Sequence, residues 1–381
     1  MRLEICPSLS AIDPAHWNAL VGDGLPFLEW GWLASLEDSA CVTAKTGWAP
    51  QHLTLWEGER LVGACPLYVK GHSQGEFIFD HGWAEAAQRG GIAYYPKLLV
   101  AVPFTPAAGV RLLAHPDFER TAIVRTLGEA LRDVCERNAF SSVHVNFCAD
   151  DEVDALQGLG FIQRTGYQFQ WRNPGWQTFD DYLAALRSKR RIQIKRERRE
   201  LAAQGIEIET HAGDDIPDEL FPSMFRLYKS TIDKLYWGRQ YLNERLFDLL
   251  RERWKQRLCF MVARQHGRIV AGTFCVRKGP VLYGRYWGCF QDFRYLHFNL
   301  CYYASIEYCL REGIARFEPG AGGEFKYLRG FDAHPTESMH HLTHPALARA
   351  VRDYVRRERA TVVQEIDWLE DQSAIKKPRP L

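Results

Sequence analysis

The chain has 381 residues, enough for two domains of ordinary size, and 46% of them are hydrophobic, so it can bury two cores. Its 48 Lys and Arg nearly balance its 47 Asp and Glu. This composition excludes a disordered or fibrous protein, and any affinity for nucleic acid or membranes has to come from a local patch because the overall charge supplies none.

The sequence offers no sign of export or membrane insertion. The first ten residues contain Glu4 and Pro7 and lack the apolar run of a secretory signal. The longest apolar stretch, 98–114, is interrupted by two prolines and an arginine, which makes it a poor membrane span. Ten cysteines are scattered without a C-x-x-C pair, so we expect reduced thiols and no disulfide partner. These features predict a cytoplasmic protein without a transmembrane segment.

The first half begins with helices and continues into a sheet. Asp13 followed by Pro14 is typical of a helix start, and 27–36 continues with apolar residues at helical spacing. Alternating apolar residues over 53–69, with a turn at 57–59, predict a β-hairpin. Four further elements are expected in chain order: a helix at 118–137, a strand at 142–147, a helix at 151–159 and a strand at 168–171.

The second half repeats this order. We expect a hairpin of 260–263 with 269–276, a strand at 282–287, a helix at 298–311 and a strand at 316–318. Without gaps, Arg60, Val62 and Lys70 align with identical residues 208 positions later, namely Arg268, Val270 and Lys278. A Gly-Phe pair also precedes the closing strand of each half. We infer an internal duplication, with a first domain over 1–175 and a second over 176–381.

Several stretches are similar to the FemAB-like family of the GNAT acyltransferase superfamily, whose members are described as peptidoglycan biosynthesis or recognition proteins. These stretches are 47–52, 94–106, 282–288, 316–321, 323–326 and 329–331. The resemblance covers nearly the whole chain. It implies an α+β fold of two tandem GNAT-like halves, with mixed sheets flanked by helices, and an N-acyltransferase or aminoacyltransferase activity.

The loops before the main helices bear on the acyl donor. GNAT enzymes that use acetyl-CoA present a glycine-rich loop at a helix N-terminus, where backbone N–H groups hold the pyrophosphate. Neither 106–111 nor 293–297 has that pattern, which weighs against acetyl-CoA. The resemblance implies instead an aminoacyl ester of tRNA, passed to an amine on a peptidoglycan precursor. We expect no tightly bound cofactor, and aminoacyl-tRNA or acyl-CoA as co-substrate.

A basic run follows the middle of the chain. Residues 187–199 contain eight Lys and Arg and a single acid, Glu197, and they predict a basic helix over approximately 183–203 that opens the second half. Such a helix can bind the phosphates of tRNA or of a nucleotide-sugar precursor. The predicted anion-binding and RNA-binding residues are Arg190, Arg191, Lys195 and Arg198. The alternative is a solvated surface helix that binds no ligand.

The second half also concentrates polar groups on three neighbouring elements. These are the strand with Arg285 and Trp287, the next strand ending at Glu318, and the glycine-rich loop with Glu324, Lys326 and Arg329. We predict that the cations and Trp287 bind substrate and that Glu318 or Glu324 is the catalytic base that accepts a proton from the attacking amine. The alternative is that these charges pair with one another.

A smaller set in the first half comprises Asp80, Tyr95 and Lys97, which we predict to be substrate-binding residues. Four histidines crowd 334–344 without an acidic ligand beside them, so no metal site is predicted. Two other functions stay open from the sequence. One is a non-catalytic module that recognises cell-wall precursors, and the other is an acetyl-CoA-dependent N-acetyltransferase of small molecules.

Overall fold

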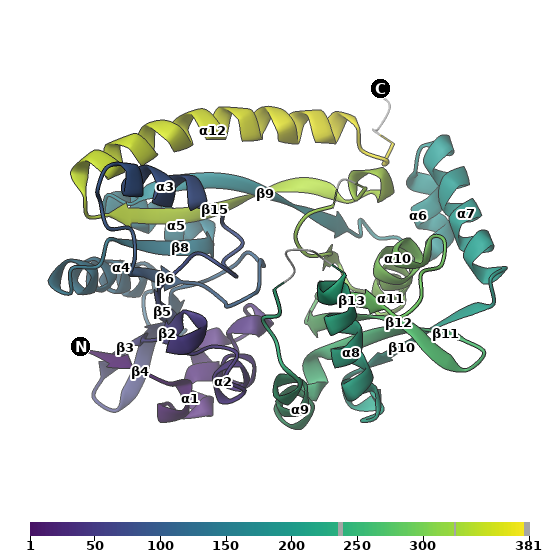
Figure 1. Cartoon of the computed structure of the whole chain (residues 1–381), viewed down its shortest axis with the longest axis horizontal. Helices are drawn as coiled ribbons and strands as arrows, with labels where there is room; N and C mark the ends of the chain where they lie inside the picture. Colours follow the sequence, from purple (N-terminus) through teal and green to yellow (C-terminus); the bar gives the residue numbers. More distant parts are fainter. Residues whose placement is uncertain (235–238, 324, 377–381) are drawn as a thin grey trace. The chain divides into compact units, whose positions relative to one another are not determined.

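A computed structural model describes residues 1–234, 239–323 and 325–376. The chain divides into two compact units, of which the first is Met1–Tyr167 with Pro335–Gln364 and the second is Gln168–His334 with Glu365–Leu381. Each unit combines helices with β-strands (Figure 1). No helix in the described part of the chain is both long and apolar enough to cross a membrane.

The N-terminal part of the first unit alternates short helices and strands, and some of its helices begin at a favourable N-cap residue. Asp13, for example, accepts hydrogen bonds from two backbone N–H groups at the start of α1. The main elements are β1 (Arg2–Cys6), α1 (Pro14–Val21), α2 (Trp30–Asp38), β2 (Trp48–Pro50), β3 (His52–Glu57), β4 (Arg60–Cys65), β5 (Leu67–Lys70), α3 (His81–Arg89), β6 (Lys97–Val100), β7 (Leu113–Ala114), α4 (Arg120–Arg137), β8 (Ser142–Cys148) and α5 (Asp150–Gly158).

Three longer elements contribute residues to both units. They are β9 (Ile162–Arg172), β15 (Asp332–Leu342) and α12 (Pro345–Asp371). In the first unit, the strands form an antiparallel sheet ordered β1-β3-β4-β7 and a mixed sheet in which β2, β5, β6, β8 and β15 are neighbours. Within the mixed sheet, β6 and β8 run parallel.

The core of the first unit lies on one face of its mixed sheet. Leu98, Val100, Val143 and Val145 alternate along β6 and β8 and pack against the buried residues of α4. The intervening positions Lys97 and His144 lie on the opposite face and are also buried. This second face is therefore a polar interior.

The second unit contains α6 (Phe179–Ala185), α7 (Ser188–Ala202), β10 (Ile206–Ala212), α8 (Leu220–Asp233), α9 (Glu244–Arg253), β11 (Leu258–Gln265), β12 (Arg268–Lys278), β13 (Val281–Cys289), α10 (Leu296–Phe298), α11 (Ser305–Arg311) and β14 (Arg316–Glu318). Its sheet order is β10-β11-β12-β13-β14-β9, and β13 and β14 are parallel. A π-helical turn, Asn299–Ala304, joins α10 to α11. Such turns are rare and often lie at functional sites.

The two units repeat one strand order. Each has an antiparallel hairpin followed by a parallel pair, β6 with β8 in the first unit and β13 with β14 in the second. Strands β4 and β5 together span 60–70, and β12 spans the residues 208 positions later. The expected single strand over 61–69 is interrupted because Pro66 has no N–H to continue the ladder, so β4 pairs with β7 and β5 pairs with β6.

The structure differs from the sequence expectations in two further places. The second unit does not include all of 176–381, because β15 pairs with β8 and the apolar face of α12 packs in the first unit through Leu347 and Val351. The basic helix does not span 183–203 continuously, since α6 ends at Ala185 and α7 begins at Ser188.

Candidate active site

The pairing of the parallel strands β13 and β14 stops well before β13 ends. Their pairing runs from Val281 with Arg316 to Tyr283 with Glu318 and ends there, while β13 continues to Cys289. The loop after Glu318 then passes close to β13, because a Cβ on Gly320 would lie 3.0 Å from the Gly284 carbonyl oxygen. The last residues of β13, from Gly284 to Cys289, thus have no β14 partner in the described part of the chain, and we call this unpaired stretch beside the end of β14 the interstrand opening.

A β-bulge places Arg285 at this opening. Phe274 of β12 pairs with Tyr286, and Cys275 pairs with Gly284, so Arg285 is the extra residue of β13. Desolvation by the surrounding protein lowers the pKa of the Arg285 guanidinium, and Tyr286 and, more weakly, the Glu318 carboxylate oppose that shift. A cation held at a strand bulge is suited to stabilising negative charge on a ligand carbonyl.

Lys326 lies on the loop that follows β14 and is only 2% exposed. Its ammonium donates to the Gly320 carbonyl oxygen at 2.6 Å and to the Ala321 carbonyl oxygen at 3.5 Å. Burial lowers the pKa of Lys326 to about 8, because the loss of solvent disfavours the charged ammonium. A lysine with a pKa near 8 can both release and accept a proton close to neutral pH.

Arg329 is engaged inside the protein. It is 1% exposed, and its guanidinium donates to the Glu197 carboxylate of α7 at 3.0 Å and to the Tyr303 hydroxyl at 2.8 Å. The guanidinium carbon also lies 3.6 Å from the centre of the Phe298 ring. Arg329 therefore links α7 to the π-helical turn, and its carboxylate partner there is Glu197.

The remaining predicted residues of this set have separate surroundings. Glu318 is 6% exposed and forms an ion pair with Arg316 at 3.2 Å. The Trp287 ring packs edge-on against His297 with centroids 4.6 Å apart. Burial lowers the pKa of His297 to about 4, so this imidazole is neutral. Glu324, the other proposed base, lies outside the described residues.

Helix α7 carries the predicted anion-binding residues. Arg198 forms an ion pair with Glu307 at 2.6 Å and stacks on Phe179, and Lys195 lies 4.0 Å from Asp180. In the described part of the chain, no carboxylate lies within 4 Å of four other cations: Lys189, Arg190, Arg191 and Arg199. Lys189 and Arg199 are exposed, whereas Arg190 and Arg191 are partly exposed and donate to Gln193 and Ser188.

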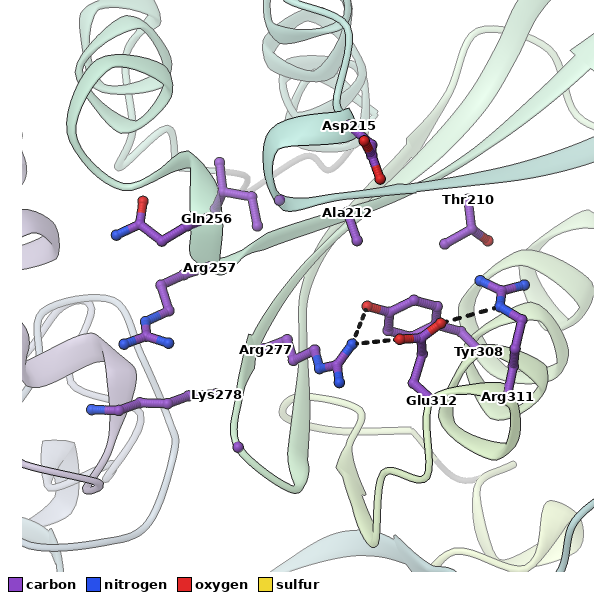
Figure 2. Close-up of a pocket in the computed structure, with 13 residues that line it drawn as sticks. Thr210, Ala212, Asp215, Gln256, Arg257, Arg277, Lys278, Tyr308, Arg311 and Glu312 are labelled. Atoms are coloured by element: carbon purple, nitrogen blue, oxygen red, sulfur yellow. Dashed lines mark hydrogen bonds and ion pairs between the residues drawn. The ribbon is translucent and has the colours of Figure 1, made fainter.

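Figure 2 shows a pocket of about 390 Å³ on the same unit, between β10, the end of β12 and the end of α11. Arg277 points into it and donates to the Tyr308 hydroxyl at 3.0 Å and to Glu312 at 2.9 Å. Arg311 also faces Glu312, at 3.3 Å. Arg277 and Arg311 both pair with Glu312, which lines the same pocket, so their charges are already balanced within it. We therefore consider the pocket a weaker candidate for catalysis than the interstrand opening.

The first unit contains a buried polar centre around Lys97. This ammonium is fully buried and donates to Ser73 at 2.8 Å, to Glu76 at 2.9 Å and to Asp80 at 2.5 Å. Burial raises the pKa of Glu76 to about 7. Burial also acts on Asp80, but the Lys97 charge outweighs it and lowers the pKa of Asp80. Asp80 and Lys97 thus pair inside the fold, whereas Tyr95 is partly exposed and bounds a pocket of about 430 Å³.

A pair of histidines extends this polar centre. Nδ1 of His144 lies 2.6 Å from Nδ1 of His340, and each ring also contacts a serine hydroxyl through Nε2. Burial lowers the pKa of His144 to about 3 and that of His340 well below its ordinary value, so one neutral ring donates to the other. His340 was considered from the sequence with three neighbouring histidines, but its partner comes from β8.

Sequence reasoning missed several members of these clusters. Glu197 had a visible signal, because it is the only acid in a run of eight cations. Lys70, whose ammonium lies 3.9 Å from Glu76 of the polar centre, had one as well, since it aligns with Lys278 in the duplication. Glu76 and His144 gave no local signal, because their role depends on strands and loops that meet only in the folded first unit.

Comparison with known proteins adds a family match. A family model described as FemAB-like, peptidoglycan biosynthesis/recognition, matches residues 8–377. The solved structure of FemX aligns with a TM-score of 0.57 and 12% identity, covering 92% of this chain and 100% of that one. No match was found among curated proteins.

Two further structures are similar. One is the C-terminal domain of a putative lysylphosphatidylglycerol synthetase from Agrobacterium fabrum, with a TM-score of 0.53, 12% identity, and coverage of 90% of this chain and 96% of that one. The other is L-PGS from Bacillus licheniformis, with a TM-score of 0.51, 8% identity, and coverage of 84% and 95%. At these identities the likeness concerns the fold alone, and the expected α+β class with mixed sheets flanked by helices is confirmed.

Proposed function

Because this chain belongs to the FemAB-like family, whose model matches residues 8–377, we propose that it is an aminoacyltransferase that passes an aminoacyl group from charged tRNA to an amine of a cell-wall precursor. The observation that supports this most directly is the separation of β13 and β14 beside Arg285 and Lys326. An activated ester and an attacking amine can meet in such an opening without a covalent enzyme intermediate.

In this proposal the ester carbonyl of the donor lies at the opening, and the amine nitrogen of the acceptor attacks its carbon. Arg285 stabilises the negative charge that develops on the carbonyl oxygen. Neutral Lys326 accepts the proton that the amine loses, and Glu318 is the alternative acceptor. The bond between the carbonyl carbon and the ribose oxygen of tRNA then breaks, and the ribose hydroxyl takes up a proton.

The choice of tRNA over acyl-CoA is supported by charge. Lys189 is exposed and Arg190 and Arg191 are partly exposed at the start of α7, and none of the three has a carboxylate within 4 Å in the described part of the chain, so phosphates can act as their partners. The segment before α10, by contrast, contains Phe293, Arg294 and Tyr295 and no glycine, so it does not resemble a pyrophosphate-binding loop.

Donor competition tests this function. We expect the purified protein to form product from charged tRNA and a soluble amine-bearing precursor, and to form none from acetyl-CoA under the same conditions. Lys326→Met should reduce the rate by roughly 100-fold or more, as expected for loss of a general base. The matched control is Lys229→Met, which removes an exposed ammonium from α8.

Two outcomes would contradict the proposal. Transfer from acyl-CoA and none from tRNA would assign the opening to a different donor. Saturable binding of the precursor without turnover of any donor would favour a recognition module, the alternative raised from the sequence.

A further inference from the structure

Strand β1 lies at the edge of the antiparallel sheet of the first unit. The order of this sheet is β1-β3-β4-β7, so in the described part of the chain β1 pairs with β3 on one side and with no strand on the other. The first four residues of β1 are exposed and the fifth is partly exposed. The outer backbone N–H and C=O groups of β1 are therefore open to pairing with a further strand.

The two faces of β1 differ in chemistry. Leu3 and Ile5 pair with buried leucines of β3 and so extend the apolar face of the sheet, yet they are 46% and 43% exposed. Arg2 and Glu4 lie on the opposite face, where they form an ion pair at 2.9 Å and are also well exposed. The edge thus presents apolar side chains on one face and two opposite charges on the other.

These side chains favour one register for a second copy of β1. In an antiparallel pair with a two-fold axis perpendicular to the sheet, one residue faces its own copy, because opposite residues point to the same face. An axis at Arg2 or at Glu4 sets like charges opposite each other, which is destabilising. An axis at Ile5 sets Leu3 opposite Pro7, which has no N–H for the ladder. An axis at Leu3 sets Arg2 of each copy opposite Glu4 of the other.

We propose that two copies of this chain associate through β1 in the register centred on Leu3, which joins their four-stranded sheets into one. Arg2 and Glu4 then form two pairs between the copies, and Ile5 lies opposite Met1, which is 68% exposed. The contact is short, since β1 has five residues, whereas stable interfaces bury about 1,200 Å² or more. We therefore expect a reversible dimer with a Kd on the order of 10 to 100 μM. This inference does not rest on the transfer reaction.

Sedimentation velocity of the full chain across a concentration series tests the proposal. The parent should shift from monomer to dimer as its concentration passes the Kd. Arg2→Glu and Glu4→Arg each set like charges opposite each other in both pairs, and each should weaken association on the order of tenfold or more. The double variant restores opposite charges and should associate as the parent does. An equimolar mixture of the two single variants should also associate, because the acids of one chain meet the arginines of the other.

Two cysteine variants test the register. In a Cys6→Ser background, Leu3→Cys places two thiols opposite each other, within the range of a disulfide, and should give a crosslinked dimer on oxidation. Ile5→Cys in the same background places them roughly 14 Å apart, too far to be joined. The matched control for charge is Arg125→Glu, which alters an exposed ion pair of α4 and should leave association unchanged.

Four outcomes would overturn the proposal. They are a parent that stays monomeric across the series, single charge variants that associate as the parent does, a mixture of these variants that stays monomeric, and crosslinking of Ile5→Cys as readily as of Leu3→Cys. The substituted positions of β1 are exposed or partly exposed, so the thermal unfolding curves of the variants should match that of the parent.

Discussion

Lys326 is the residue whose ionisation links the site to stability. In the folded protein burial holds its pKa at about 8, against an ordinary value of 10.5. Between these two pH values the unfolded chain binds more protons than the folded one, so rising pH favours the folded state. The burial of the Lys326 ammonium thus lowers the unfolding free energy at neutral pH.

This gives a signed prediction for Lys326→Met. As the pH rises from about 8 to about 10.5, the parent should gain up to about 3 kcal/mol of unfolding free energy relative to the variant. Urea denaturation at a series of pH values measures the difference. Lys229→Met, at an exposed position, should run parallel to the parent. If the unfolding free energy of Lys326→Met also changes with pH in parallel with that of the parent, the lowered pKa of Lys326 is contradicted.

The buried pair of Arg329 and Glu197 has a different expected signature. Arg329→Gln or Glu197→Gln leaves a buried charge without its partner, and each should cost about 3 to 5 kcal/mol of unfolding free energy. Combining Glu197→Gln with Arg329→Met should cost less than the sum of the single changes. Arg125→Gln, which breaks an exposed pair on α4, should cost under about 1 kcal/mol.

If the two changes lower the unfolding free energy additively, the two side chains do not depend on each other. The same measurements distinguish a structural role of Arg329 from a role in ligand binding. If Arg329→Gln kept its stability and lost only transfer, Arg329 would be returned to the role of a substrate-binding residue.

At the scale of elements, α7 shows why a charge run cannot be interpreted residue by residue from sequence. Its eight-cation segment predicts a helix and a basic surface. Only packing decides that Arg198 stacks on Phe179 and pairs with Glu307, while Arg190 and Arg191 donate to the uncharged Gln193 and Ser188 of their own helix. The helical period could not make that distinction, because the partners come from α6 and α11.

The open cations of α7 should control the salt dependence of RNA binding. Replacing Lys189, Arg190 and Arg191 by Gln should weaken tRNA binding and reduce the slope of log affinity against log salt by roughly 0.7 to 0.9 for each phosphate that the protein no longer neutralises. Filter binding across a salt series measures the slope. Thermal stability should be unchanged in this variant but lowered in Arg198→Gln, because Arg198 contributes to packing. If the slope of log affinity against log salt is the same for the parent and the triple variant, α7 is a solvated surface helix that does not bind RNA.

Strands were predicted where their pattern is local. Strand β14 coincides with the expected 316–318, and the hairpin of β11 and β12 lies where alternation placed it. The interruption at Pro66 was not foreseen, because alternation continues through it. The opening between β13 and β14 was also beyond the sequence, since it depends on where pairing stops and not on where strands begin.

The whole molecule is organised by a long-range return of the chain. Strand β15 pairs with β8 from Glu337 opposite Cys148 to Leu342 opposite Ser142, almost two hundred residues apart in sequence. Helix α12 then adds Val351 and Val355 to a cluster with Trp83. No local sequence pattern predicts that β15 and α12 pack in the first unit. The predicted domain boundary at residue 175 therefore rested on the duplication alone.

A fragment of residues 1–175 should therefore fail to fold cooperatively. Without β15 it leaves the backbone of β8 unpaired along one edge, and without α12 it exposes Trp83 and its apolar neighbours to water. A single chain in which a flexible linker joins 1–167 to 335–364 restores both and should give a sigmoidal thermal transition by circular dichroism. The matched control joins 1–167 to a sequence-scrambled copy of 335–364, which has the same composition but neither the strand register nor the apolar face. Cooperative unfolding of 1–175 alone, or of the scrambled chain, would show that the first unit does not need the returning segment.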